Sequence, residues 1–233
     1  MSNEEFGDES LYQDGTDVDI PTQFTPSAEH IAHDGPRDVG VVFIGDSFVA
    51  GYGDPKGHGW VSRVVGRTQH PDLDLTTYNL GVRGDSSADV LARWRTEGML
   101  RWRDRRERRL VLGVGINDVN QGLTTARSRL NLANILDDAT ARGISPFVVG
   151  PTPTLDPVVN EKLEVIVEAQ SDVCSRRSIP FVDCFYPLAE HDQWLSELAS
   201  SRDQVHPGQA GYGLLAWLVL HGEWETWLQI SQA

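Results

Sequence analysis

The stretch VGVVFIGDS, residues 39–47, decides the fold of this chain. Its first six residues are apolar without a break, which is typical of a strand buried on both faces in a parallel sheet. The strand runs directly into Gly45, Asp46 and Ser47, so it would present a hydroxyl group at its carboxyl end. From Val39 onward, short β-branched runs alternate with longer helical stretches. This alternation indicates an α/β protein with helices on both faces of the sheet.

The alternation predicts a three-layer α/β/α fold built on a five-stranded, flavodoxin-like parallel sheet. Strands are expected at residues 39–44, 76–80, 110–114, 146–149 and 180–182, and helices near 59–69, 87–99, 123–142, 157–177, 188–199 and 208–220. A sheet order of 2-1-3-4-5 places the second and third strands on either side of the first. The fifth strand then lies about 14 Å from the first, at ~4.8 Å per strand, and residues 184–205 are long enough to return.

The charge of the chain is concentrated near its N-terminus. Of a net charge of −14, residues 1–38 contribute −9 through ten acids and one arginine. That region also has three prolines and no apolar periodicity, so it predicts an acidic, largely disordered arm, followed by one domain over residues 39–233. The arm is either an extension without a specific role or a docking segment for a protein partner or for the domain itself. The acidic balance argues against a nucleic-acid-binding protein.

Signals for export, membrane insertion and metal binding are missing from the sequence. Residues 1–5 lack the basic start of a secretory signal, and the longest apolar runs fall short of the roughly 18 residues of a membrane helix. Cys174 and Cys184 form neither a disulfide framework nor a zinc pattern. We therefore predict a soluble, cytoplasmic protein with reduced cysteines, no cofactor and no metal.

Five residues together have the chemistry of acyl transfer. Ser47 is a candidate nucleophile, although serine is also a frequent helix N-cap. His206 can act as general base with Asp203 as its acidic partner, although an Asp-x-x-His pair is often only a loop hydrogen bond. The backbone N–H groups of Ser47 and Gly81 and the amide of Asn117 can hold a developing oxyanion. Gly81 and Asn117 are also common turn residues.

Four short blocks carry a family resemblance: GDS at 45–47, NLG at 79–81, GIND at 115–118 and DQVHP at 203–207. They resemble, in order, the signature blocks of the SGNH (GDSL-type) hydrolase superfamily, over roughly residues 39–220. The resemblance implies the SGNH fold, a catalytic triad of Ser47, His206 and Asp203, and an oxyanion hole of Ser47, Gly81 and Asn117. Phe48 departs from the family's commonest form, which has an aliphatic residue at that position.

The resulting hypothesis is a lipase-like serine esterase that acts on a small-molecule acyl ester. It would hydrolyse O-acyl esters with a short or medium acyl chain through an acyl-enzyme on Ser47. One alternative is an acyltransferase that passes the same acyl group to an acceptor other than water. The other is a noncatalytic binding module with the same fold.

Several other side chains have expected structural roles. Asp46 is expected to hydrogen-bond the backbone of its own loop. The arginines of Arg93–Arg109 are interpreted as a solvated face with local ion pairs, or as a contact for the acidic arm or an anionic substrate group. Four tryptophans are expected to be packing residues: Trp94, Trp102, Trp194 and Trp217.

Overall fold

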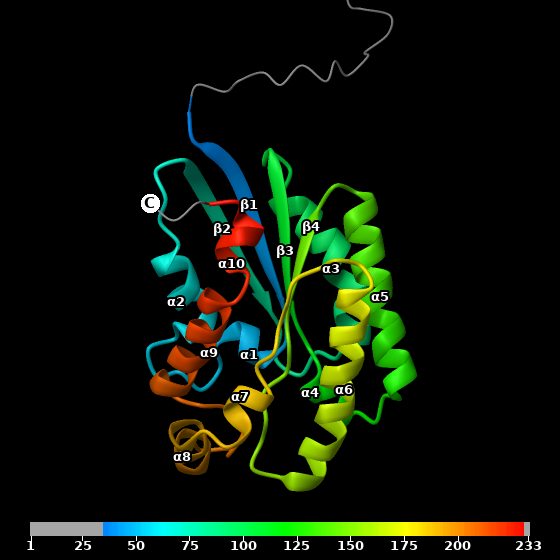
Figure 1. The fold of residues 1–233 in the computed structure, drawn as a ribbon, viewed down its shortest axis with the longest axis vertical. Helices are drawn as coiled ribbons and strands as arrows, with labels where there is room; N and C mark the ends of the chain where they lie inside the picture. Colours follow the sequence, from blue (N-terminus) through cyan, green and yellow to red (C-terminus); the bar gives the residue numbers. More distant parts are fainter. Residues whose placement is uncertain (1–34, 231–233) are drawn as a thin grey trace, which may run out of the picture. The chain divides into compact units, whose positions relative to one another are not determined.

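Five parallel strands form one sheet in the computed structural model, which describes residues 35–230 (Figure 1). In spatial order they are β2 (Leu73–Gly81), β1 (Arg37–Gly45), β3 (Glu107–Gly113), β4 (Ser145–Val149) and β5 (Phe181–Val182). This order confirms the predicted 2-1-3-4-5 sheet and the α/β fold class. β1 begins two residues earlier than predicted, because Arg37 and Asp38 pair with β2. Residues 1–34 of the predicted arm lie outside the described residues.

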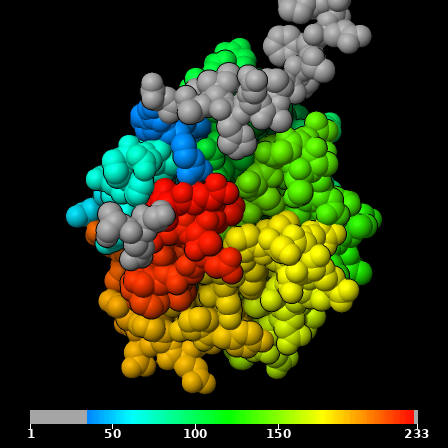
Figure 2. All heavy atoms as spheres, turned by 45° about the horizontal axis from the view of Figure 1, so that its top comes forward, coloured from blue at the N-terminus to red at the C-terminus, as the bar shows by residue number. Residues whose placement is uncertain are grey.

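Helices cover both faces of the sheet because the buried side chains of β1 alternate between them. Val41 and Phe43 share a hydrophobic cluster with residues of α2 (Gly59–Arg67), α9 (Gln209–His221) and α10 (Trp224–Leu228). Val42 and Ile44 share the second cluster with residues of α3 (Ser87–Arg101) and α5 (Thr125–Ala141). Helix α6 (Pro157–Ser175) contributes to both clusters. In Figure 2 the C-terminal segment, in red, lies at the surface between α2 in cyan and α6 in yellow.

The helix predicted near residues 188–199 is broken into two. The structure has α7 (Tyr186–Ala189) and α8 (Asp192–Ser200), separated by His191 with an extended backbone at φ −80° and ψ 111°. The prediction was wrong because no glycine or proline within 188–199 marks the break. Three short helices were not predicted: α1 (Ser47–Ala50), α4 (Ile116–Asn120) and α10.

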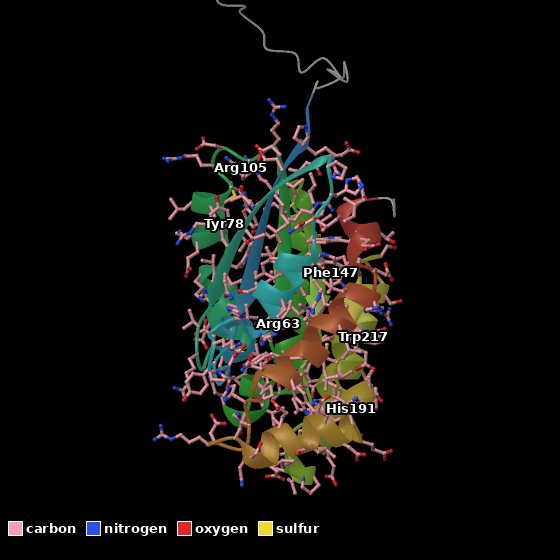
Figure 3. The ribbon with its side chains drawn as sticks, turned by 90° about the vertical axis from the view of Figure 1, so that its left-hand side faces the viewer. Arg63, Tyr78, Arg105, Phe147, His191 and Trp217 are labelled. Carbon is pink, nitrogen blue, oxygen red and sulfur yellow. The ribbon has the colours of Figure 1, made fainter. Side chains whose placement is uncertain are left out.

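The four tryptophans expected to pack do not behave alike. Trp94, Trp102 and Trp194 are buried, as predicted, whereas Trp217 of α9 is 55% exposed (Figure 3). Trp217 stacks on His221 with the ring centroids 4.1 Å apart. The prediction for Trp217 was wrong because α9 is apolar around almost its whole circumference, so its sequence does not show which side faces solvent.

Candidate active site

Ser47, His206 and Asp203 form one continuous chain of hydrogen bonds. Ser47 Oγ lies 2.7 Å from His206 Nε2, and His206 Nδ1 lies 2.8 Å from Asp203 Oδ2. Ser47 and His206 are 4% and 8% exposed, and they are 159 positions apart in the sequence. The fold thus brings together the three side chains that the sequence singles out for acyl transfer.

Three glycines at one level of the sheet bring the strand ends close to Ser47. Gly45 of β1 is paired with Gly81 of β2 on one side and Gly113 of β3 on the other. A Cβ atom on Gly45 would lie 2.0 Å from the Gly113 carbonyl oxygen, and one on Gly81 would lie 2.2 Å from the Ala50 nitrogen. Helix α1, which begins at Ser47, therefore sits directly against the ends of the neighbouring strands.

Asp203 is held in place by the backbone that follows it. Its Oδ1 accepts hydrogen bonds from the N–H groups of Val205 and His206, at 3.1 and 3.0 Å, which leaves Oδ2 for the His206 ring. Gln204, which lies between Asp203 and Val205, has a left-handed backbone at φ +56°. This conformation costs free energy for a residue with a side chain. Burial alone would raise the pKa of Asp203, but the hydrogen bonds from His206 and Val205 lower it to about 2.

Two aromatic rings fix the orientation of the His206 imidazole. The rings of Phe48 and Tyr52 each lie 4.9 Å from it, measured between centroids. Tyr52 is itself anchored, because the Tyr212 hydroxyl donates to its carbonyl oxygen at 2.5 Å. The Arg83 guanidinium covers the Tyr52 ring, 3.6 Å from its centroid. Nothing in the sequence distinguishes Tyr52 except its position five residues after Ser47.

Two of the three candidate oxyanion donors already have acceptors within the protein. The Gly81 N–H donates to Asn79 Oδ1 at 3.0 Å, and Asn117 Nδ2 donates to the Asp85 carbonyl oxygen at 2.9 Å. A primary amide has two N–H donors, so Asn117 keeps one for a ligand. Gly81 has a single N–H, which would have to be shared with a ligand or released by Asn79. The Ser47 N–H lies at the first position of α1, where no intrahelical acceptor exists.

Asp46 caps the helix that carries Ser47. Its Oδ1 accepts the Phe48 N–H at 2.9 Å, which confirms the expected loop hydrogen bond. The carboxyl group is only 3% exposed. Burial raises the pKa of Asp46 to about 7, helped by the charges of Asp118 and Asp85 and opposed by backbone N–H groups.

The raised pKa of Asp46 predicts how stability depends on pH. The folded state holds this proton more tightly than the unfolded chain, so the associated stability is present below about pH 4 and is lost as pH rises through 7. Asn at position 46 would keep the cap without the buried charge. We expect Asp46→Asn to raise Tm by several degrees at pH 8 and by much less at pH 4. Asp74→Asn, at an exposed position of β2, is the control, and a pH-independent difference for Asp46→Asn would contradict the assignment.

Two open grooves flank the Asp203 and His206 segment. One, of about 550 Å³, is lined by residues that include Tyr52, Arg202 and His206. The other, of about 350 Å³, has Ile116, Leu155 and Val205 in its walls. Asp203 lies in the walls of both grooves, whereas Ser47 lines neither of them.

The cysteines, metal-binding groups and membrane helices considered in the sequence can also be compared with the structure. Cys174 and Cys184 are free and buried, and burial raises the pKa of the Cys174 thiol to about 12. Within residues 35–230, no three His, Cys, Asp or Glu side chains are grouped as a metal would require. No helix in this range is both long enough and apolar enough to cross a membrane.

Arginines within residues 93–109 form ion pairs inside the domain. Arg93 pairs with Asp85 and Glu97, and Arg105 pairs with Asp38 at 2.7 Å. This agrees with the interpretation of local ion pairs. A contact between these arginines and the acidic arm lies outside the described residues, except at Asp38, which belongs to β1.

The profile of the GDSL-like lipase/acylhydrolase family matches residues 43–214, which include Ser47, Gly81, Asn117, Asp203 and His206. The chain belongs to this family. Among curated relatives, the chain is 29% identical over 110 residues to the esterase TesA of Pseudomonas aeruginosa. That match covers 47% of this chain and 53% of TesA, so it spans about half of the relative's length.

Solved structures of low sequence identity share the fold. A catalytic mutant of Axe2, an acetylxylan esterase from Geobacillus stearothermophilus, matches with a TM-score of 0.70 at 19% identity, over 85% of this chain and 99% of that one. The lipase/acylhydrolase from Enterococcus faecalis matches with a TM-score of 0.64 at 22% identity, over 83% and 99% of the two chains. These similarities support the SGNH hydrolase fold.

Proposed function

We propose that this protein is a serine esterase that hydrolyses O-acyl esters of short or medium acyl chain length. The observation that carries the proposal is the hydrogen-bonded chain from Ser47 Oγ through His206 to Asp203, with links of 2.7 and 2.8 Å. Such a chain serves to activate a hydroxyl group for attack on a carbonyl carbon. Membership of a family of lipases and acylhydrolases points to the same chemistry.

Acylation would begin at the bond between Ser47 and His206. Ser47 Oγ attacks the ester carbonyl carbon while its proton passes to His206 Nε2, and the carbonyl oxygen takes up the negative charge. The carboxylate of Asp203 stabilises the imidazolium through Nδ1. When the tetrahedral intermediate collapses, the alcohol oxygen leaves with the proton from Nε2, and the acyl group remains on Ser47.

Deacylation would use the same groups with water as the nucleophile. His206 Nε2 takes a proton from the water as its oxygen attacks the acyl carbon. The second intermediate collapses by breaking the bond to Ser47 Oγ, which regains its proton from His206. The carboxylic acid leaves, and no cofactor takes part in the proposed cycle.

The oxyanion would be bound by the Ser47 and Gly81 N–H groups and the Asn117 amide. We expect Asn117→Ala to lower kcat by about 10²–10³-fold, because one oxyanion donor contributes on that order, while KM changes little. Initial rates on 4-nitrophenyl acetate give both constants. Asn120→Ala, in the same short helix α4, is the control. A wild-type kcat for Asn117→Ala would remove this residue from the oxyanion hole.

The acyl-enzyme allows one alternative outcome, which is transfer of the acyl group to an alcohol. Similarity to an esterase and to an acetylxylan esterase supports hydrolysis of esters, including esters with a short acyl chain. A panel of 4-nitrophenyl esters that varies the acyl chain, run with and without added glycerol, separates the two reactions by product analysis. Free acid as the dominant product supports the esterase, and predominant glycerol ester would make the protein an acyltransferase.

A further inference from the structure

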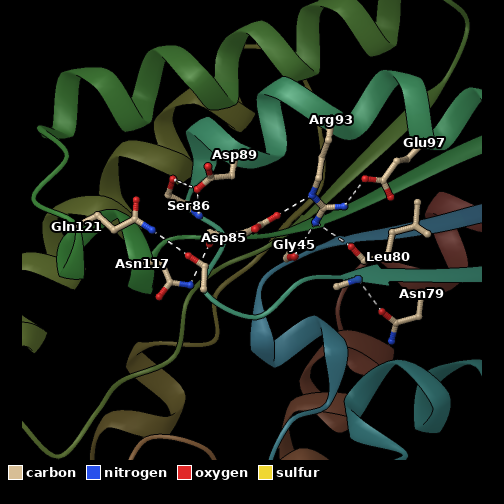
Figure 4. Close-up of polar contacts among 12 residues, drawn as sticks. Gly45, Asn79, Leu80, Asp85, Ser86, Asp89, Arg93, Glu97, Asn117 and Gln121 are labelled. Carbon is tan, nitrogen blue, oxygen red and sulfur yellow. Dashed lines mark hydrogen bonds and ion pairs between the residues drawn. The ribbon is translucent and has the colours of Figure 1, made fainter.

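The side chain of Arg93 connects the end of β1, which leads into the candidate nucleophile, to the end of the neighbouring strand β2. Arg93 lies on α3, and its side chain is 18% exposed. Its Nη2 donates to the carbonyl oxygens of Leu80, at 2.9 Å, and Gly45, at 3.1 Å (Figure 4). Leu80 precedes Gly81 at the end of β2, and Gly45 ends β1 two residues before Ser47.

The contact with Leu80 acts on the same peptide group that carries the Gly81 N–H. In a trans peptide the C=O of one residue and the N–H of the next are coplanar and point in opposite directions, and no described peptide is cis. A charged donor on the Leu80 oxygen therefore fixes the plane in which the Gly81 N–H points. It also withdraws electron density from that amide, which makes the N–H a stronger donor.

A second path leads from Arg93 to Asn117 through Asp85. Arg93 Nε donates to Asp85 Oδ2 at 2.6 Å, and the carbonyl oxygen of Asp85 accepts the hydrogen bond from Asn117 Nδ2 at 2.9 Å. Gln121 supports the same loop by donating to the Gly84 carbonyl oxygen at 2.9 Å. Figure 4 shows these contacts as one continuous group between α3 and the two strand ends. The guanidinium thus holds the loop on which both candidate donors depend.

We propose that Arg93 is a positioning residue for the oxyanion hole. It orients and polarises the Gly81 N–H through the Leu80 carbonyl group, and it places the Asn117 amide through Asp85. The inference rests on the proposed esterase function. It adds that the guanidinium acts without touching the substrate. A guanidinium suits this position because its rigid fork can reach several acceptors at once, which a lysine ammonium cannot do in the same geometry.

Glu97 offers a matched control, because it forms an ion pair with the same Arg93 side chain. Arg93 Nη1 lies 3.3 Å from Glu97 Oε1, one helical turn away, and the Glu97 side chain is 34% exposed. Pairs of this kind contribute little to stability. Glu97→Gln removes this ion pair and leaves the carbonyl contacts intact, so it separates the proposed role from loss of surface charge pairing. Arg95→Met, at a more exposed position of the same helix, controls for loss of an arginine.

The test is steady-state kinetics on 4-nitrophenyl acetate with Arg93→Met, Arg93→Lys and the two controls, below the Tm of every variant. We expect Arg93→Met to lower kcat by about 10- to 100-fold, since it misaligns donors that each contribute about 10²–10³-fold, with KM within about twofold. Arg93→Lys, which keeps the charge, should recover only part of the loss. The controls should retain wild-type kcat.

A second readout is inhibition by methaneboronic acid, whose tetrahedral adduct with Ser47 places an oxygen where the oxyanion would lie. We expect its inhibition constant to rise in the Arg93 variants by a factor similar to the fall in kcat. A loss that appears in KM, an unchanged boronate affinity or full activity in Arg93→Met would overturn the inference. If Ser47→Ala keeps wild-type activity, the proposed function fails and the inference about Arg93 fails with it. If Ser47→Ala is inactive and Arg93→Met keeps full activity, only the inference about Arg93 is overturned.

Discussion

Replacement of Ser47 by alanine is expected to lower kcat on 4-nitrophenyl acetate by a factor on the order of 10⁴–10⁶. The change removes the only oxygen that lies within hydrogen-bond distance of His206 Nε2 among the described contacts, at 2.7 Å. Without that hydroxyl no acyl-enzyme forms, and the remaining donors can only assist direct attack by water. The residual rate of this variant also shows how much of any measured rate comes from hydrolysis of the ester in the buffer.

The Ser47 variant requires proof that the fold is intact. Ser47 is buried, and alanine is smaller than serine, so its Tm should stay within a few degrees of wild type. Ser62→Ala, at an exposed position of α2, should keep full activity. Adding His206→Ala to Ser47→Ala should cost almost nothing further, because residues that act as one unit are not additive. Activity of Ser47→Ala near the wild-type level would exclude the proposed mechanism.

Asp203→Asn is expected to lower kcat by about 10⁴-fold, because it reverses the hydrogen bond to the His206 ring. Asp203 Oδ1 accepts two backbone N–H groups, so the amide oxygen of asparagine has to occupy that position. Its NH₂ group then faces His206 Nδ1 and turns that atom into an acceptor. The ring proton moves to Nε2, which can no longer take the proton of Ser47.

The same variant tests the depressed pKa of Asp203. The carboxylate contributes stability above about pH 4, and this contribution is lost as pH falls through about 2. Tm of Asp203→Asn should therefore lie below wild type at pH 7, and the difference should shrink as the pH is lowered towards 2. Asp192→Asn, in the exposed first turn of α8, is the control. Wild-type kcat in Asp203→Asn would remove Asp203 from the mechanism.

The sheet could be predicted from the sequence because its strands contain short apolar or β-branched runs that are separated by helices. β1 shows this best, since residues 39–44 are buried on both sides and carry no polar residue. The division between α7 and α8 could not be predicted, because it depends on the backbone of His191 and not on a helix-breaking residue. The exposure of Trp217 depends on which side of α9 meets the sheet, and that is a tertiary property.

The five candidate site residues could be found because each stands in a recognisable block after a strand end or before α9. Arg93 could not be found in this way. In the sequence it is one of eight arginines between residues 93 and 109, and nothing distinguishes it from those that face solvent. Its position becomes clear only when α3 is packed across the ends of β1 and β2, where it reaches two carbonyl oxygens.

The separation of Ser47 and His206 along the chain makes activity a measure of complete folding. Ser47 follows the first strand, whereas His206 precedes α9, and 159 positions lie between them. In the proposed mechanism, the candidate base meets the candidate nucleophile only when the segment that follows β5 is docked beside the start of α1. A fragment that stops before residue 206 would carry the hydroxyl and no base. Ester turnover therefore reports on the finished domain, and an intermediate with a formed sheet but an undocked C-terminal segment would be inactive.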